Sequence, residues 1–107
     1  MGLYVSLTLV KETEIYSDNI THNLTEMAEE AGIYMHLWRP EEIGIEKAWE
    51  LIEPLKAGIA RLKSDPERFR AFDSPNGWGL YIHFLPFVER YLEQCEYNPD
   101  ATISVSR

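Results

Sequence analysis

Two short stretches at opposite ends of the chain alternate apolar and polar residues, and they constrain the fold more than any other feature. The apolar members are Leu3, Val5, Leu7 and Leu9 near the start and Ala101, Ile103 and Val105 near the end. A period of two is typical of a β-strand with one buried face. Because such short strands are not stable alone, we expect the two ends of the chain to pair with each other.

The residues that follow the first strand carry mainly helical signals. Ile15 and Tyr16, after a polar turn at 11–14, are compatible with a short third strand. Asn19 is a suitable N-cap and Gly32 a suitable C′ residue for a first helix. At about 100° per residue, the apolar stripe of that helix would be Ile20, Leu24, Met27, Ala28 and Ala31. His22, Glu26 and Glu29 would lie on the opposite side.

Two longer helices are predicted beyond a helical turn at 33–39 that Pro40 ends. The first runs from Ile45 to Lys63, with Trp49 on its apolar face, and the second runs from Leu80 to Cys95. Pro54 and Pro86 lie inside them. Since proline lacks an amide donor, each helix is expected to kink or to break there, and the sequence leaves the two outcomes open.

The length and composition indicate one domain spanning residues 1–107. A chain of 107 residues with 45% hydrophobic and 12% aromatic content has enough apolar surface to fold alone. We therefore predict an α+β fold, a mainly helical single domain whose terminal strands form a small antiparallel or mixed sheet. The edges of that sheet are exposed for a second copy, so a homo-oligomer is expected.

The charge balance restricts the possible partners. A formal net charge of −8 repels polymeric nucleic acid and anionic membrane surfaces, although a local pocket built on Arg39 could hold a small anion. The chain has a single cysteine, Cys95, and no signal sequence or apolar run of about 20 residues. These features predict a cytoplasmic protein.

The segment from Asn19 to Asn23 is the first candidate for a working surface. Asn19, Thr21, His22 and Asn23 supply two amides, a hydroxyl and an imidazole within five residues. Such groups bind polar organic ligands by hydrogen bonds. The sequence therefore predicts ligand contacts at this turn.

Three further residues are candidate ligand contacts. Trp38 offers a flat stacking surface beside the forked donors of Arg39, and Trp78 lies between two glycines in a polar loop that could close over a ligand. Structural roles compete with these interpretations. Trp38 and Arg39 could instead pin a helix end to the core, and Trp78 could plug the core beneath its loop.

Catalysis has weaker support in the sequence. His22 and Glu26 are spaced i, i+4 and would be the acid or base of a hydrolase, if the protein is an enzyme. The chain contains no catalytic triad pattern, phosphate-binding loop or dinucleotide-binding glycine pattern. No metal site and no cofactor are predicted, and the balance favours a protein without enzymatic activity.

Three motifs together resemble a known family. Ile20-Thr21-His22-Asn23-Leu24, Leu37-Trp38-Arg39-Pro40-Glu41-Glu42 and Asn76-Gly77-Trp78-Gly79 are similar to motifs of a family of small uncharacterised proteins of bacteriophages and bacterial genomes. The resemblance implies a phage-type accessory protein in the host cytoplasm. Such a protein could act in counter-defence, by sequestering a nucleotide immune signal or by binding a host protein.

The leading functional hypothesis is therefore a protein that binds a small polar or nucleotide-like ligand. It requires the turn at Asn19–Asn23 to face Trp38, Arg39 and Trp78 across one hollow. The alternatives are an acidic protein that binds or inhibits another protein, and a hydrolase that uses His22.

Overall fold

The computed structural model describes residues 2–9 and 13–107 of the chain. Its sheet is antiparallel, with β1 (Gly2–Leu9) in the centre between β2 (Thr13–Thr21) and β3 (Thr102–Ser106). The register of the terminal strands places Val5 opposite Val105 and Leu7 opposite Ile103. The predicted α+β class and the pairing of the two chain ends are thus confirmed.

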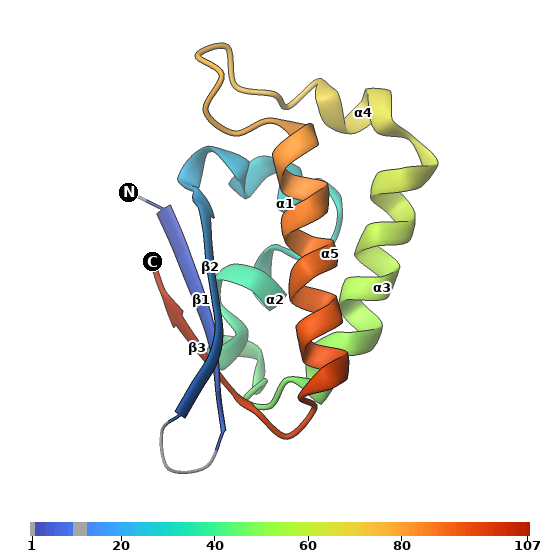
Figure 1. Ribbon diagram of the computed structural model, residues 1–107. Helices are drawn as coiled ribbons and strands as arrows, with labels where there is room; N and C mark the ends of the chain where they lie inside the picture. The colour runs from blue at the N-terminus through green and yellow to red at the C-terminus, as the bar shows by residue number, and fades with distance from the viewer. Residues whose placement is uncertain (1, 10–12) are drawn as a thin grey trace.

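The helices cover one face of this sheet, as Figure 1 shows. They are α1 (Thr25–Glu30), α2 (Tyr34–Trp38), α3 (Trp49–Ser64), α4 (Pro66–Arg70) and α5 (Tyr81–Tyr97), with 3-10 turns η2 (His22–Leu24) and η3 (Pro40–Ile43). The core lies between the two layers, where Leu3, Val5 and Leu7 of β1 are fully buried. In the described part of the chain, no helix combines the length and apolarity that crossing a membrane requires.

The second strand is longer than predicted, and the helix predicted to begin at Asn19 does not begin there. Asn19, Ile20 and Thr21 belong to β2, which spans nine residues. Branched and aromatic side chains at Ile15, Tyr16 and Ile20 favour an extended backbone. Ile20 lies opposite Leu3 of β1 and is partly buried against the core, so strand pairing outweighs the capping ability of Asn19. The predicted turn at 11–14 lies partly outside the described residues.

The first helix begins later and ends where predicted. The Thr21 side chain accepts a hydrogen bond from the Asn23 amide at 3.4 Å and thereby starts η2, after which α1 begins at Thr25. Gly32 follows α1 with φ of 77°, the left-handed conformation expected of a C′ residue. The predicted apolar residues Leu24, Met27, Ala28 and Ala31 are buried, and His22, Glu26 and Glu29 are exposed.

Neither internal proline breaks its helix. The helix α3 continues through Pro54 and α5 continues through Pro86. The prediction that Trp49 belongs to the core is wrong, because its side chain is 57% exposed. Trp49 is the first residue of α3, and the buried stripe of that helix starts only at Leu51.

A half-buried histidine in α2 makes the stability of the fold depend on pH. Burial, followed by the nearby positive charge of Arg61, lowers the pKa of His36 below its usual value of 6.5. The unfolded chain therefore binds a proton at this residue more readily than the folded protein does. The contribution of neutral His36 to the free energy of unfolding is fully present above about pH 6.5. It is lost as the pH falls through the lowered pKa of the folded protein.

We expect His36→Gln to weaken this pH dependence. Urea unfolding of both proteins at a series of pH values between about 7 and 5, above the usual range of carboxylates, measures the difference. The midpoint of the wild-type protein should fall further than that of the variant. Parallel curves for the two proteins would contradict the assignment.

Candidate ligand-binding site

A hollow of about 1230 Å³ opens at the end of the sheet where β2 continues into η2. We call it the loop hollow, because the loop between α4 and α5 extends over this end of the molecule (Figure 1). It is lined by Gly2, Leu3, Tyr4, Asn19, Ile20, Thr21, His22, Asn23, Leu24, Asn76, Gly77, Trp78, Gly79, Ile82, His83, Pro86 and Arg90. Five of the seven ligand contacts predicted from the sequence therefore lie together here, namely Asn19, Thr21, His22, Asn23 and Trp78.

The loop that carries Trp78 is fastened to η2. The side-chain amide of Asn23 donates to the carbonyl oxygen of Trp78 at 2.8 Å, and the Trp78 amide donates to Asn76 Oδ1 at 2.9 Å. Gly79 has φ of 105°, and a Cβ at this position would lie 2.8 Å from Cβ of Asn23 and 3.2 Å from Cγ2 of Thr21. The close passage of the loop along these residues thus requires glycine at position 79.

Apolar side chains are exposed around the loop hollow. Tyr4 is 53% exposed, Trp78 is 70% exposed and Ile82 is 60% exposed. They make up half of the six exposed large hydrophobic side chains in the described part of the chain, and all three line the loop hollow. Apolar surface gathered at a concave site in this way is typical of ligand binding.

The polar groups of the loop hollow include a guanidinium, two imidazoles and three side-chain amides but no carboxylate among the described residues. Arg90, His22 and His83 line it together with the side chains of Asn19, Asn23 and Asn76. This composition contrasts with the net charge of −8 of the whole chain. The arrangement can donate hydrogen bonds to a polar ligand without repelling a negative charge.

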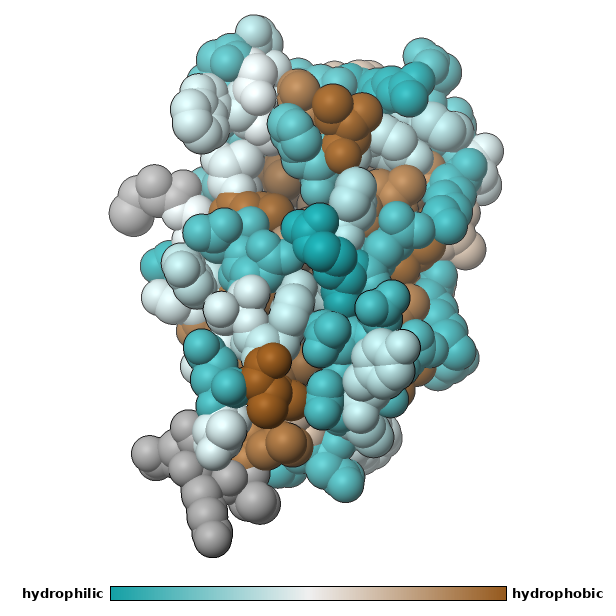
Figure 2. Space-filling model, in the orientation of Figure 1, coloured by the Kyte–Doolittle hydropathy of each residue, from teal (hydrophilic) through white to brown (hydrophobic). Residues whose placement is uncertain are grey.

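Three of these residues, Asn76, His83 and Arg90, are absent from the ligand contacts predicted from the sequence, and the last two belong to α5. Ile82, His83, Pro86 and Arg90 follow one another along one side of α5, over about 12 Å of helix. His83 and Arg90 could have been predicted from their helical spacing relative to apolar residues on the exposed side of the same helix. Figure 2 shows this side of the molecule, with strongly hydrophilic groups across its middle and hydrophobic groups above and below them.

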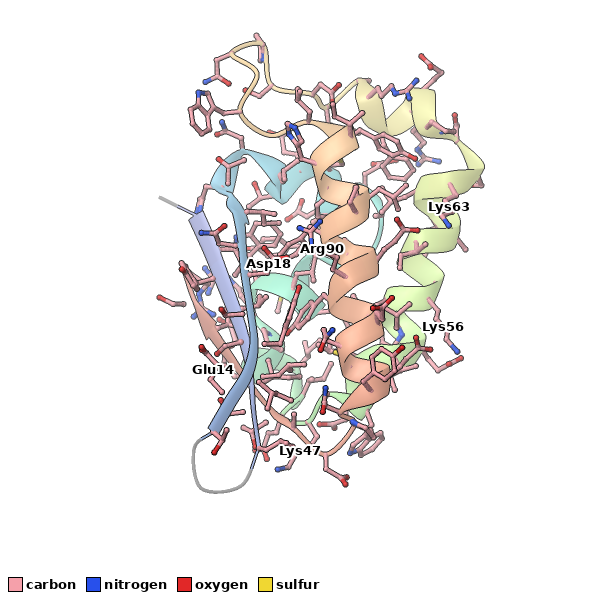
Figure 3. The ribbon with its side chains drawn as sticks, viewed as in Figure 1. Glu14, Asp18, Lys47, Lys56, Lys63 and Arg90 are labelled. Carbon is pink, nitrogen blue, oxygen red and sulfur yellow. The ribbon has the colours of Figure 1, made fainter. Side chains whose placement is uncertain are left out.

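Arg90 of α5 and Asp18 of β2 point toward each other, as Figure 3 shows. Arg90 donates to Asp18 Oδ2 from Nε at 3.0 Å, and its Nη2 lies 2.9 Å from the same oxygen. Burial works against the charge of Arg90, but the hydrogen bond and the charge of Asp18 outweigh it and raise the pKa of the guanidinium. The hydroxyl of Tyr16 donates to Oδ2 at 2.9 Å, and burial and this contact raise the pKa of the phenol.

Trp38 and Arg39 do not line the loop hollow, so the predicted common site is not formed. Trp38 is only 1% exposed and stacks on Tyr34, with ring centroids 5.6 Å apart, so its indole has no open face for a ligand. Arg39 donates to the Tyr34 hydroxyl at 3.1 Å and to Glu42 at 2.7 Å. Trp38 and Arg39 therefore have the structural role that was the alternative to ligand binding: they hold the end of a helix against the core.

A smaller recess of about 340 Å³ adjoins the loop hollow and contains the predicted acid–base pair. His22 and Glu26 line it with Asp73, and no hydrogen bond joins His22 to Glu26. Asp73 is already engaged, because its Oδ1 accepts from the Tyr81 amide at 2.7 Å. Within residues 2–9 and 13–107, no three His, Cys, Asp or Glu side chains come close enough to hold a metal ion.

Comparisons with known proteins identify no relative of this chain. No protein-family model, no curated protein and no solved structure matches this chain. Functional inference therefore depends on the geometry and chemistry of the loop hollow.

Proposed function

We propose that the protein binds a small polar ligand with a planar, nucleotide-like group in the loop hollow. The observation that carries this proposal is the exposed indole of Trp78, which lies in the same hollow as a guanidinium, two imidazoles and three side-chain amides. An indole stacks well on a heteroaromatic base, and amides and imidazoles form hydrogen bonds with its edges and its sugar.

The size of the loop hollow supports a ligand of this kind. Pockets for small molecules usually enclose about 300 to 1,000 Å³. At about 1230 Å³ the loop hollow is larger and admits a ligand of nucleotide size. Ile82 also lines the loop hollow and adds a second exposed apolar side chain to that of Trp78.

The biological setting of the proposal follows from the motif resemblance. A phage-type accessory protein in the host cytoplasm that binds a nucleotide-like signal would lower its free concentration without transforming it. Sequestration of this kind needs no catalytic group. An oligomer and a host-protein partner remain predictions, and light scattering of the purified protein measures the first.

Tryptophan fluorescence tests the proposal. In a Trp49→Phe background, which removes the other exposed indole, a ligand that stacks on Trp78 should quench the emission. The panel contains cyclic dinucleotides, ADP-ribose and ordinary nucleotides. Adding Trp78→Ala to this background should weaken binding about 5- to 150-fold, measured by calorimetry, because stacking on a base contributes about 1 to 3 kcal/mol.

Trp49 provides the matched control, because it starts α3 at the end of the molecule away from the loop (Figure 1). Trp49→Phe alone should leave the affinity unchanged. A folded protein that binds no member of the panel would contradict the proposal and would favour the alternative of an acidic protein that binds another protein. Equal affinity with and without Trp78 would place the ligand elsewhere.

A further inference from the structure

Arg90 is the described residue that gives the loop hollow a permanent positive charge. Its side chain is 54% exposed and extends from α5 at the end of a row that also includes Ile82 and His83. Like the rest of the lining that the structure describes, this row has no carboxylate. A negative group in the loop hollow would meet the guanidinium of Arg90 directly, whereas the carboxylate paired with that guanidinium, on Asp18, is not part of the lining.

The orientation of this guanidinium is fixed by Asp18. Asp18 Oδ2 binds Nε and Nη2 of Arg90, so Nη1 is left without a hydrogen bond to any described residue. The carboxylate is itself held, because Oδ2 also accepts from the Tyr16 hydroxyl at 2.9 Å and Oδ1 accepts from the Asn19 amide at 2.8 Å. The Asp18 side chain is 20% exposed, which shields the ion pair from solvent more than a surface pair.

We propose that the ligand carries a phosphate group and that Arg90 binds it, with Asp18 as the residue that positions Arg90. This inference rests on the proposed function and names the chemical class of the ligand. A guanidinium held at two of its nitrogens loses little further freedom when it binds an anion. His22 and His83 line the same hollow and supply further N–H donors for the phosphate oxygens.

The test compares AMP with adenosine, which differ by one phosphate. Calorimetry on the wild-type protein should give an AMP affinity at least about tenfold higher than that of adenosine, since a charge-assisted contact of this kind is strong. This preference should shrink as the salt concentration rises. Arg90→Gln should reduce the ratio of the two affinities several-fold toward one, mainly through weaker binding of AMP.

Two variants separate positioning from folding. Asp18→Asn keeps an oxygen that can accept from the Asn19 amide but removes the charge that holds Arg90. We expect the affinity ratio to fall, less than in Arg90→Gln, because lost positioning outweighs the removal of a carboxylate near the phosphate. An unchanged or higher ratio would overturn the positioning role of Asp18. Lys63→Gln is the matched control, because it removes the same charge from an ion pair with Glu89 of α5, at 3.0 Å, without altering the loop hollow. Figure 3 places Lys63 on α3, away from Asp18. Lys63→Gln should leave the ratio unchanged.

The affinity ratio distinguishes the possible failures. A general loss of structure would weaken both probes equally, and thermal unfolding of each variant measures it directly. Equal affinity of the wild-type protein for AMP and adenosine would overturn the phosphate assignment and leave the proposed function intact. Every member of the panel carries phosphate, so if another member binds and AMP does not, that ligand replaces AMP in the test, and an affinity that Arg90→Gln leaves unchanged would overturn the phosphate assignment. If no member of the panel binds, both proposals fail.

Discussion

Trp38→Ala is expected to lower the free energy of unfolding by about 3 to 5 kcal/mol, the range for removing a large aromatic side chain from a core. The Trp38 indole is 1% exposed and stacks on Tyr34, so its removal leaves a cavity that the neighbouring helices cannot fill. Trp78→Ala should change the same free energy by less than about 0.5 kcal/mol, because the side chain is 70% exposed. Urea unfolding monitored by circular dichroism measures both.

Trp38→Phe refines this comparison. Nε1 of Trp38 is buried and has no hydrogen-bond partner among the described residues. Phenylalanine would remove this unpaired donor while keeping most of the packing, so its cost should be well below that of alanine. Equal stability losses in Trp38→Ala and Trp78→Ala would contradict the assignment of Trp38 to the core and of Trp78 to the surface.

Gly79→Ala is expected to destabilise the Trp78 loop and to abolish ligand binding. The added methyl group would lie 2.8 Å from Cβ of Asn23, and φ of 105° is strained for any residue with a side chain. Strain and overpacking together should cost about 2 kcal/mol or more. Because the loop must move away from η2, the hydrogen bond from Asn23 to the Trp78 carbonyl should be lost and Trp78 displaced.

Gly44→Ala is the matched control for this experiment. Gly44 also has a positive φ, of 75°, but a Cβ there would meet no atom within 4 Å. Gly44→Ala should therefore lower the free energy of unfolding only by the backbone strain, about 1 to 2 kcal/mol, and should leave ligand affinity unchanged. Thermal unfolding and calorimetry on both variants separate the effect of backbone strain from the effect of the close contact with Asn23. A Gly79→Ala protein that binds as well as Gly44→Ala would show that the loop does not need its close contact with Asn23.

The sequence predicts the overall fold well because its strongest signals are local. Alternation at the two ends indicates strands, and each apolar stripe of the long helices indicates a buried face. The signals conflict at Asn19–Thr21, where a good N-cap residue precedes a helical stripe but is surrounded by branched residues. Pairing with Gly2–Tyr4 decides in favour of the strand, and that pairing involves residues far away in the sequence.

The site could be predicted only in part, for the same reason. Asn23 and Trp78 are recognisable as polar or exposed, but the hydrogen bond between them joins residues 55 positions apart. Arg90 becomes notable only through Asp18, which is 72 positions away. Trp38 and Trp78 both lie in short polar motifs, and only tertiary packing shows that one is buried and the other exposed. Burial and long-range pairing are properties of the whole fold.

The central strand of the sheet obtains one of its two neighbours from the last residues of the chain. Thr102–Ser106 pairs with Tyr4–Thr8, so one side of β1 stays open until those residues have left the ribosome. Closing a loop of nearly the entire chain also carries an entropic cost that slows folding. One edge of β1 therefore stays unpaired until synthesis has passed Ser106, and the three-stranded sheet cannot be completed before that point.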